Sequence, residues 1–402
     1  MRIEISPSKA TGTIMAPPSK SMAHRLLICA ALAKGTSTLT GMSDCEDVLA
    51  TIDCLRALGV DCTKRDDTVT VNGGLNPALE PLSALRCRES GSTIRFLIPV
   101  ALLSGKKMTL TGAPALLRRP MTVYETLCRE KGLLFEQTAD GFVVKGPLTA
   151  GEYTLPGNVS SQFISGMLFA LTQTTGKSTL KILPPLESRS YLHLTVSALR
   201  EFGADVTWTD DYTLKIDGGM PMRAHDCAVE GDYSNAAFLE AFNLFGGEVT
   251  VGGLRGDSLQ GDRVYRDCFA ALLRGGETVS LENCPDLGPI LFAVAAAKRG
   301  GRFTNTRRLK IKESDRAEVM AQELRKFGAT VRVYENNVEI EPTAFHTPTE
   351  PLCGHNDHRI VMSLAILASV TGGVIEGAEA AAKSFPDFFD RIRSIGIAAK
   401  EI

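Results

Sequence analysis

The sequence predicts an α/β protein of two domains, built from one structural unit that is repeated six times. The 402 residues suffice for at least two hydrophobic cores. A short, almost wholly apolar helix recurs six times, and each is followed by a glycine, a strand-like segment and a second helix that ends at another glycine. Helix–strand alternation alone fits many α/β proteins, so the recurrence of both glycines is what favours a repeat. The paired glycines are Gly35 and Gly59, Gly105 and Gly132, Gly176 and Gly203, Gly246 and Gly275, Gly301 and Gly328, and Gly373 and Gly396.

The first helix of each unit is predicted to lie inside its domain. A helix that is apolar on all sides has no face for water and is buried on every side. The six segments are LLICAALA (26–33), FLIPVALL (96–103), GMLFALT (166–172), AAFLEAFNLF (236–245), ILFAVAAA (290–297) and IVMSLAILAS (360–369).

A strand and a second, more amphipathic helix are predicted after each apolar helix. The strand-like segments are 35–41, 105–112, 176–183, 246–253, 300–307 and 372–379. The second helices end in CLRALG, CREKG, ALREFG, ALLRGG, ELRKFG and RIRSIG, where glycine suits the left-handed end of a helix. Paired strands such as TVTVNGG, GFVVKG and YTLKIDGG close most units.

The two ends of the chain are expected to meet in one domain. Only IAAKEI follows Gly396, so the last unit is truncated, while MRIEISPSKATG at the start is predicted to form a strand and a turn. We expect residues 1–13 and 229–402 to form one domain and residues 14–228 the other, with the boundary near CAVEGDYS, residues 227–234.

Composition and charge exclude several classes of function. The chain has 44% hydrophobic residues and a net charge of −2, which argues against broad binding of nucleic acid or a membrane surface. No apolar run approaches the roughly 18 residues of a membrane span, and the start lacks a cleavable signal pattern. The ten cysteines show no CxxC pair and no zinc-type spacing, which suits reduced thiols and a cytoplasmic location.

The segments in front of the six apolar helices are unusually polar. Helix capping explains any one such segment, but a lysine or arginine there opposes the helix dipole unless an anion lies nearby. Lys20, Arg25 and Arg359 lie within a turn of such fronts, and Arg95 slightly further in. We therefore expect helix fronts from both domains to face one cleft that binds a small ligand with several negative charges. The segments are SKSMAHR, ESGSTIR, NVSSQF, GDYSNA, PDLGP and HNDHR.

Nine motifs along the whole chain resemble, in order, those of the 5-enolpyruvylshikimate-3-phosphate (EPSP) synthase family. They are PPSKSMAHR, ESGSTIR, LLRRPM, SSQF, ESRSY, PDLGP, KIKESDR, NDHR and KSFPDFF. The resemblance implies an α/β enolpyruvyl transferase fold (inverse α/β prism) with three βαβαββ units in each of two domains and the active site in the cleft between them. It implies transfer of the enolpyruvyl group of phosphoenolpyruvate to the 5-hydroxyl of shikimate 3-phosphate, a step of the shikimate pathway towards chorismate and aromatic amino acids.

The resemblance also implies the ligands and partners of the enzyme. No metal or organic cofactor is expected, the protein is expected to be a monomer, and glyphosate, the family's known inhibitor, is expected to compete with phosphoenolpyruvate. Shikimate 3-phosphate is expected at Lys20, Ser21, Arg25, Ser160, Ser161, Gln162, Ser188, Tyr191, Asp286 and Lys312. Phosphoenolpyruvate is expected at Lys20, Gly91, Arg119, Gln162, Arg316, His358, Arg359 and Lys383. Serine hydroxyls suit a phosphate, the planar fork of arginine suits a carboxylate, and a side chain at Gly91 would crowd the ligand.

Three residues are the candidates for proton transfer in an addition–elimination reaction. Asp286 is expected to act on the 5-hydroxyl, Glu313 near the methylene carbon, and Lys20 as an acid towards the leaving phosphate. Other roles are open from the sequence: Asp286 as a helix cap, and Glu313 in a surface ion pair with Lys310 or Lys312.

Some residues depart from the pattern of the family, and two other functions compete with the one that the resemblance implies. Glu89 and Arg308 stand where relatives often have asparagine or a neutral residue; Glu89 can pair with Arg86 or Arg88, and Arg308 can bind the shikimate phosphate or point away. Cys353, His355 and His358 fit no familiar zinc spacing. One rival is the enolpyruvyl transferase that acts on UDP-N-acetylglucosamine, but its hallmark cysteine is missing from TGAPALLRRPM. The other is a non-catalytic anion-binding relative, which would gain nothing from Asp286 and Glu313.

Overall fold

The computed structural model describes residues 1–75, 81 and 83–402. The chain forms two compact units. Unit 1 comprises Met1–Pro17 and Gly231–Ile402, and unit 2 comprises Pro18–Glu230. The chain therefore passes between the units at Pro17–Pro18 and at Glu230–Gly231, against the boundaries after residues 13 and 228 that the sequence suggests.

Unit 2 contains the first three predicted repeats. Its apolar helices are α1 (Lys20–Leu32), α3 (Gly91–Ala101) and α6 (Ser161–Leu171). The second helices are α2 (Glu46–Ala57), α5 (Thr122–Lys131) and α7 (Arg189–Glu201). A further short helix, α4 (Pro114–Leu117), precedes α5.

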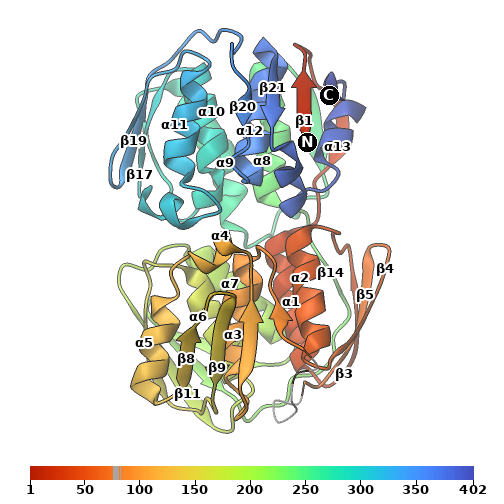
Figure 1. Cartoon of the computed structure of the whole chain (residues 1–402), viewed down its shortest axis with the longest axis vertical. Helices are drawn as coiled ribbons and strands as arrows, with labels where there is room; N and C mark the ends of the chain where they lie inside the picture. Colours follow the sequence, from red (N-terminus) through yellow and green to blue (C-terminus); the bar gives the residue numbers. More distant parts are fainter. Residues whose placement is uncertain (76–80, 82) are drawn as a thin grey trace. The chain divides into compact units, whose positions relative to one another are not determined.

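Three four-stranded sheets accompany these helices, and each has the same order of strands. The first pair in each sheet is parallel and the next two pairs are antiparallel. Figure 1 shows β3, β5 and β4 side by side at the edge of the unit. The sheets are β14 (Cys227–Ala228), β3 (Gly35–Thr40), β5 (Thr68–Gly73) and β4 (Asp61–Arg65); β6 (Leu85–Arg86), β7 (Met108–Thr111), β9 (Gly141–Lys145) and β8 (Leu134–Gln137); and β10 (Glu152–Pro156), β11 (Lys177–Leu183), β13 (Thr213–Asp217) and β12 (Asp205–Asp210).

Unit 1 contains the other three repeats. The apolar helices are α8 (Tyr233–Ala241), α10 (Gly288–Ala297) and α12 (His358–Thr371), and the second helices are α9 (Tyr265–Arg274), α11 (Arg316–Arg325) and α13 (Phe388–Ser394). One sheet is β16 (Thr278–Ser280), β17 (Gly301–Thr304), β19 (Asn337–Ile340) and β18 (Val331–Val333). The next is β20 (Leu352–Cys353), β21 (Gly373–Glu376), β1 (Arg2–Ile5) and β22 (Ala399–Glu401).

The two chain ends meet in this last sheet, as the truncated repeat predicts. Ile3 of β1 pairs with Glu401 of β22, and Arg2 pairs with Glu376 of β21 on the other side. The N-terminal strand thus occupies the place that the returning strand of a complete unit takes in the other four-stranded sheets.

The fourth repeat departs from the plan. Its strand β15 (Glu248–Gly252) pairs only with β2 (Thr11–Met15), so this sheet has two strands within the described part of the chain. The reason is connection length: only Gly275–Glu277 separate α9 from β16, which leaves no room for a hairpin.

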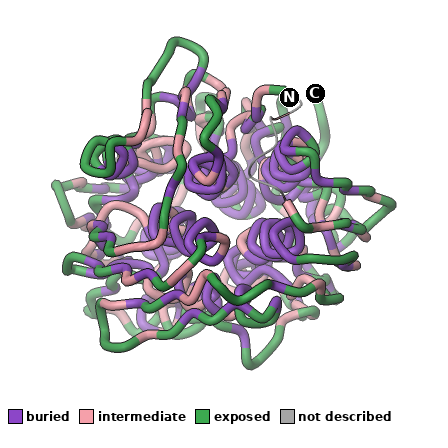
Figure 2. Tube along the Cα trace, turned by 90° about the horizontal axis from the view of Figure 1, so that it is seen from below, coloured by how far each residue is buried: buried purple, intermediate pink, exposed green. Residues whose placement is uncertain are grey.

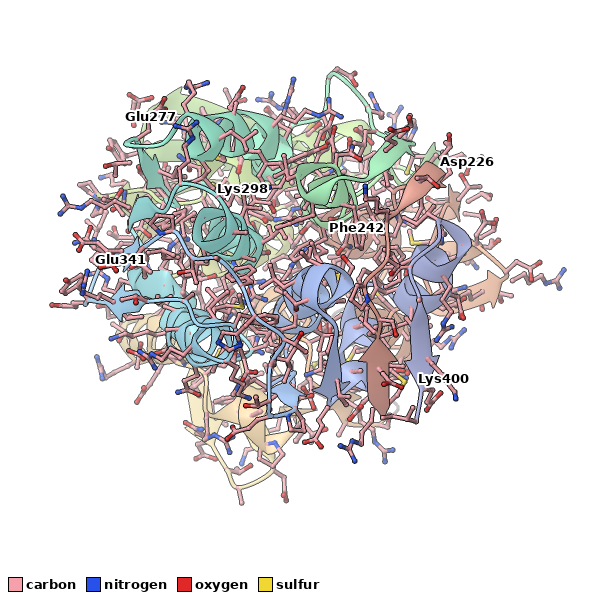
Figure 3. All side chains as sticks on the ribbon, turned by 90° about the horizontal axis from the view of Figure 1, so that it is seen from above. Asp226, Phe242, Glu277, Lys298, Glu341 and Lys400 are labelled. Atoms are coloured by element: carbon pink, nitrogen blue, oxygen red, sulfur yellow. The ribbon has the colours of Figure 1, made fainter. Side chains whose placement is uncertain are left out.

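The apolar helices lie inside their units, as predicted. Every residue of α1 from Met22 to Leu32 is buried, and α10 is buried from Gly288 to Ala296. Figure 2 shows the buried trace concentrated in helices, with exposed trace on outer strands and loops. In Figure 3 the labelled Glu277 and Glu341 lie towards the outside of unit 1, and both are exposed. No helix in the described ranges is both long enough and apolar enough to cross a bilayer.

Candidate active site

Side-chain caps begin five of the six apolar helices, so the capping role is correct for these positions. The capping oxygens belong to Ser19, Ser90, Ser160, Asp232 and Asp357. Capping does not account for the cations. Lys20 is the first residue of α1, and Arg359 is the second residue of α12. Both add positive charge where the helix dipole is already positive.

The front of α1 holds two cations in fixed positions. The Lys20 ammonium lies 2.8 Å from a carboxylate oxygen of Asp47, which is in the first turn of α2. Arg25 is buried and donates to the carbonyl oxygens of Ser21 (2.7 Å) and Tyr191 (3.0 Å) and to the hydroxyl of Thr195 (2.8 Å). Burial lowers the pKa of Arg25 to about 10, so its guanidinium remains charged near neutral pH.

The fronts of α3 and α6 are joined by polar side chains. Gln162 donates to the hydroxyl of Ser92 at 2.9 Å and accepts from Arg95 at 2.7 Å. The backbone N–H of Gln162 also donates to the Ser160 hydroxyl at 3.3 Å, and Ser161 is the first residue of α6. The Ser160 hydroxyl oxygen accepts from the helix, and the hydrogen of the same hydroxyl can still donate to an anion.

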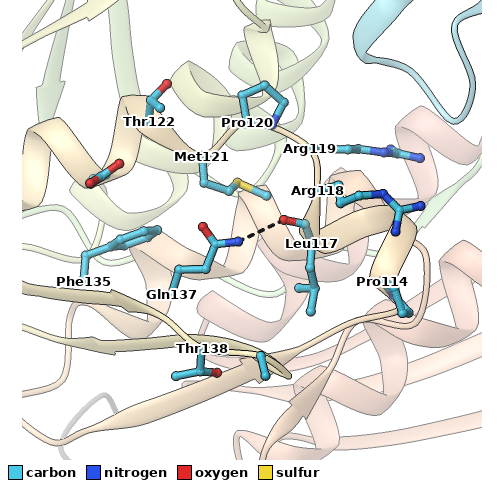
Figure 4. A pocket seen from close by; sticks show the side chains of 12 residues that line it. Pro114, Leu117, Arg118, Arg119, Pro120, Met121, Thr122, Phe135, Gln137 and Thr138 are labelled. Carbon is cyan, nitrogen blue, oxygen red and sulfur yellow. Dashed lines mark hydrogen bonds between the residues drawn. The ribbon is translucent and has the colours of Figure 1, made fainter.

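Arg119 approaches the front of α3 where residue 91 has no side chain. A Cβ atom at Gly91 would lie 2.7 Å from Nη1 of Arg119 and 3.5 Å from Nη1 of Arg95. Arg118 and Arg119 line one side of a pocket of about 450 Å³, and Gln137 on its floor donates to the Leu117 carbonyl at 3.1 Å (Figure 4).

Two predicted ligands lie on α7. Tyr191 is in its first turn, and its ring centroid is 5.8 Å from the Arg25 guanidinium carbon. Ser188 is the N-cap residue, with φ of 56°, and its side chain makes no capping hydrogen bond. This left-handed conformation is uncommon for a serine.

In unit 1, Arg316 lies at the centre of a cluster of carboxylates. Its guanidinium donates to Asp357 (2.8 Å), Asp286 (2.8 Å) and Glu313 (2.6 Å), and the side chain is 1% exposed. Burial acts to lower the pKa of Arg316, but the three carboxylates outweigh it and raise the pKa above its ordinary value. A second Nη1 hydrogen remains for a ligand.

Asp286 faces three cations. Besides Arg316, it lies 2.9 Å from the Lys312 ammonium and 3.9 Å from the Arg359 guanidinium. Burial acts to raise the pKa of Asp286, but Lys312, Arg316 and Arg359 outweigh it and hold the pKa well below its usual value. Burial also lowers the pKa of Lys312, although the charge of Asp286 opposes this change.

Two further predicted ligands lie at or beside the beginning of α12. Lys383 donates to the carbonyl oxygen of Asn356 at 2.6 Å, and His358 is buried at the first position of the helix. Arg359 is also buried, and its Nε atom has no hydrogen-bond partner among the residues described. A buried donor of this kind is costly unless a ligand accepts from it.

The structure decides several roles that the sequence leaves open. Asp286 does not cap a helix but forms ion pairs, and Glu313 contacts Arg316 at 2.6 Å. Arg308 is buried and donates to the Glu282 carbonyl at 2.6 Å.

Two further residues singled out in the sequence have protein partners. Arg88 forms ion pairs with Glu46 (2.5 Å) and Asp53 (2.6 Å). His355 contacts Glu323 at 2.9 Å, and no group of metal-binding side chains occurs in the described ranges.

Three acidic residues of these clusters were not predicted from the sequence. Asp47, Asp357 and Asp262 each contact or face a predicted site residue. The acid two residues before Arg359 in NDHR is the one signal that could have revealed Asp357. Asp262 is fully buried and bonds the Ser234 hydroxyl. Burial, together with the nearby charge of Asp286, raises the pKa of Asp262 to about 7.

Asp262→Asn is expected to stabilise the protein, most strongly at alkaline pH. Because the folded pKa of Asp262 is raised, the wild type loses stability as the pH rises from about 4 to about 7. Asparagine removes that loss, so we expect a gain on the order of 2 kcal/mol near pH 8 and a smaller one near pH 5. Urea unfolding at both pH values measures it. Asp257→Asn, at a carboxylate that is 72% exposed, is the matched control. An equal gain in the free energy of unfolding at both pH values would contradict the raised pKa of Asp262.

The fold defines an α/β protein of the enolpyruvyl transferase class, with lysine and arginine at the beginnings of its buried helices. The family model of EPSP synthase (3-phosphoshikimate 1-carboxyvinyltransferase) matches residues 5–392. The 3-phosphoshikimate 1-carboxyvinyltransferase of Clostridium kluyveri is 37% identical over 98% of this chain and 97% of its own length. That of Clostridioides difficile is 32% identical with the same coverage. A solved EPSP synthase structure from Acinetobacter baumannii matches with a TM-score of 0.80 and 25% identity over 99% of both chains. The chain belongs to the EPSP synthase family, and the family and fold class predicted from the motifs are confirmed.

Proposed function

We propose that this chain transfers the enolpyruvyl group of phosphoenolpyruvate to the 5-hydroxyl of shikimate 3-phosphate, forming EPSP and phosphate. The full-length match to a family of this transferase activity carries the proposal. The match favours this reaction over the UDP-N-acetylglucosamine rival. We further propose a cytoplasmic location, for the reasons of composition given above, and a monomeric enzyme that needs no cofactor, as the family resemblance implies.

We propose that shikimate 3-phosphate binds mainly to the helix fronts of unit 2. Ser160, Ser161 and Ser188 present hydroxyls at the fronts of α6 and α7, where backbone N–H groups favour a phosphate. Lys20 and Arg25 supply charge, and Tyr191 supplies a ring against the guanidinium of Arg25. The remaining proposed ligands are Ser21, Gln162, Asp286 and Lys312.

Phosphoenolpyruvate is proposed to bind cations of both units, beside α3 in unit 2 and on α11 and α12 in unit 1. Arg119 reaches the space beside Gly91, while Arg316 and Arg359 each retain a donor suited to a carboxylate or phosphate. Lys383 lies close by along the chain segment of Asn356. The remaining proposed ligands are Lys20, Gln162 and His358.

Asp286 is proposed to take the proton of the 5-hydroxyl as the substrate oxygen bonds to C2 of phosphoenolpyruvate. In the protein alone, Lys312, Arg316 and Arg359 hold the pKa of this carboxyl low, which makes it a weak base. Anionic substrates would neutralise those cations and raise the basicity of Asp286 at the moment it is needed. Substrate binding thereby prepares the base.

Glu313 and Lys20 complete the proposed reaction. Glu313 gives a proton to C3, so that the methylene becomes a methyl group and a tetrahedral ketal forms. The C2–O bond to phosphate then breaks, Lys20 protonates the departing phosphate, and one methyl proton is removed to restore the double bond. Each step moves only protons and electron pairs, and no oxidant or reductant is required.

A phosphate-release assay tests the proposal. The protein is incubated with phosphoenolpyruvate and either shikimate 3-phosphate or UDP-N-acetylglucosamine. Phosphate release is expected with shikimate 3-phosphate as the acceptor and not with UDP-N-acetylglucosamine. Glyphosate should raise the apparent KM for phosphoenolpyruvate without lowering the maximal rate. Absence of release with shikimate 3-phosphate would refute the proposed function, and release with the nucleotide sugar would favour the rival.

Gly91→Ala is expected to raise the KM for phosphoenolpyruvate and to weaken glyphosate binding, each about tenfold. The new Cβ would lie 2.7 Å from Nη1 of Arg119, which must move away from its place beside the helix front. Because that guanidinium is the end of a flexible chain, the fold should remain intact. Steady-state kinetics and thermal melting check both statements. Gly105→Ala, where an added Cβ meets nothing within 4 Å, should leave KM unchanged.

A further inference from the structure

A chain of four buried side chains runs through unit 2 behind the front of α1. Nδ1 of His24 lies 2.7 Å from the Thr51 hydroxyl, and that hydroxyl lies 2.7 Å from the hydroxyl of Thr93. Thr93 in turn donates to the hydroxyl of Ser90 at 2.7 Å. All four side chains are fully buried, so water does not compete for these hydrogen bonds. We call these four residues the hydroxyl relay.

The relay has one favoured direction. Burial lowers the pKa of His24 to about 3, so its ring is neutral and carries a single N–H. Nε2 of this ring has no hydrogen-bond partner in the part of the chain that is described, which favours the N–H on Nδ1, where Thr51 accepts it. Thr51 then donates to Thr93, and Thr93 to Ser90.

The relay joins three helices near their N-terminal ends, and two of them, α1 and α3, carry proposed substrate contacts. His24 lies one turn after Lys20 on α1, and Thr51 lies one turn after Asp47 on α2. The relay therefore runs directly behind the Lys20–Asp47 ion pair, and the Thr93 hydroxyl is also 3.4 Å from the Asp47 carbonyl oxygen.

At its far end the relay reaches the front of α3. The Ser90 hydroxyl accepts from the backbone N–H of Thr93 at 3.2 Å and so caps this helix. Gly91 follows Ser90 directly and leaves the space that Nη1 of Arg119 approaches. The position of this helix front thus depends on the hydroxyl of Thr93, which also meets Thr51, one turn after Asp47 on α2.

We propose that Thr51 and Thr93 are positioning residues for phosphoenolpyruvate, which set the separation between the Lys20 ammonium and the turn at Gly91. Neither residue touches the substrate in this proposal. The inference rests on the proposed function, since that assigns Lys20 and Gly91 to phosphoenolpyruvate. It goes beyond that function because it assigns to two buried hydroxyls, which touch no substrate, an effect on the binding of phosphoenolpyruvate but not on the binding of shikimate 3-phosphate.

Thr93→Val and Thr51→Val test the inference in the full chain. Valine keeps the volume of threonine and removes only the hydroxyl, while Thr93→Ser keeps the hydroxyl and removes a methyl group. We expect the valine variants to raise the KM for phosphoenolpyruvate about tenfold. The KM for shikimate 3-phosphate should remain within about twofold, and Thr93→Ser should restore the KM for phosphoenolpyruvate most of the way.

Two matched variants separate positioning from general loss of a buried hydroxyl. Thr195→Val removes a hydroxyl that accepts from Arg25 at 2.8 Å, so it should raise the KM for shikimate 3-phosphate instead. Thr174→Val removes a buried hydroxyl that donates to the Leu171 carbonyl at 2.8 Å, at the opposite end of α6, and should change neither KM.

Several results would overturn the inference. In Thr93→Val, the KM values for both substrates could rise equally, or neither could rise. In Thr93→Ser, the KM for phosphoenolpyruvate could rise as much as in Thr93→Val. Calorimetric titration with phosphoenolpyruvate, alone and with shikimate 3-phosphate, repeats the comparison without turnover. A wild-type chain that binds phosphoenolpyruvate but releases no phosphate would therefore refute the proposed function, while a valine-specific loss of that binding would still support the relay.

Discussion

Replacing Lys20 by methionine is expected to lower kcat about a thousandfold or more while the protein remains folded. Methionine has a similar volume but no charge, so the proposed acid and the cation at the front of α1 are both lost. The Asp47 carboxylate, now without the ammonium at 2.8 Å, would also repel an incoming anion. Phosphate release under saturating substrates measures the loss, and thermal melting checks the fold.

Lys64→Met is the matched control for this prediction. Lys64 forms an ion pair with Asp44 at 2.6 Å, and its side chain is 13% exposed, close to the 14% of Lys20. It lies on β4, a strand that carries no proposed ligand. We expect its kcat to stay within about twofold of the wild type. If Lys20→Met retained more than about a tenth of the activity, the proposed role of Lys20 would be wrong.

Arg316→Met is expected to destabilise unit 1 by about 3–5 kcal/mol and to abolish turnover. Arg316 is 1% exposed and bonds three carboxylates, so its loss leaves Asp357, Asp286 and Glu313 to repel one another in a buried setting. Denaturant unfolding measures the loss. Arg332→Met, which removes an ion pair with Glu341 at 2.6 Å whose side chains are about half exposed, is expected to cost no more than about 1 kcal/mol.

The cost of Arg316→Met should also depend on pH. In the wild type the folded pKa of Asp286 is depressed, so this carboxyl contributes stability above its ordinary pKa of about 4 and loses that contribution as the pH falls. The variant lacks Arg316, one of the three cations that lower the pKa of Asp286. The difference in unfolding free energy between the two proteins should therefore be largest above about pH 5 and should narrow on acidification. A difference that is constant with pH would contradict the role assigned to the Asp286 contact.

Much of the fold could be predicted because its signals are local. Apolar runs such as 26–33 and 360–369 mark helices that have no face for water, and glycines such as Gly132 and Gly203 end helices with the positive φ that other residues rarely adopt. The unusual position of the cations at the fronts of α1 and α12 could also be recognised from the sequence, because a lysine or arginine there opposes the helix dipole.

The two-stranded sheet of the fourth repeat could not be predicted from its strand alone. The segment 246–253 has the same pattern as its counterparts. Its sheet is smaller because only three residues separate α9 from β16. Helix ends are the least certain feature of any sequence pattern.

By itself, the sequence determined the repeat, the buried helices, the charged fronts and the family, since each depends on residues close together in the chain or on ordered motifs. Tertiary structure alone decided the partners. Asp47 meets Lys20 across 27 residues, Asp357 meets Arg316 across 41, and Thr51 meets Thr93 across 42. A helical pattern shows which face of an element is buried, but which side chain of another element faces it depends on how the helices pack. Ion pairs and hydroxyl chains therefore become visible only in the folded protein.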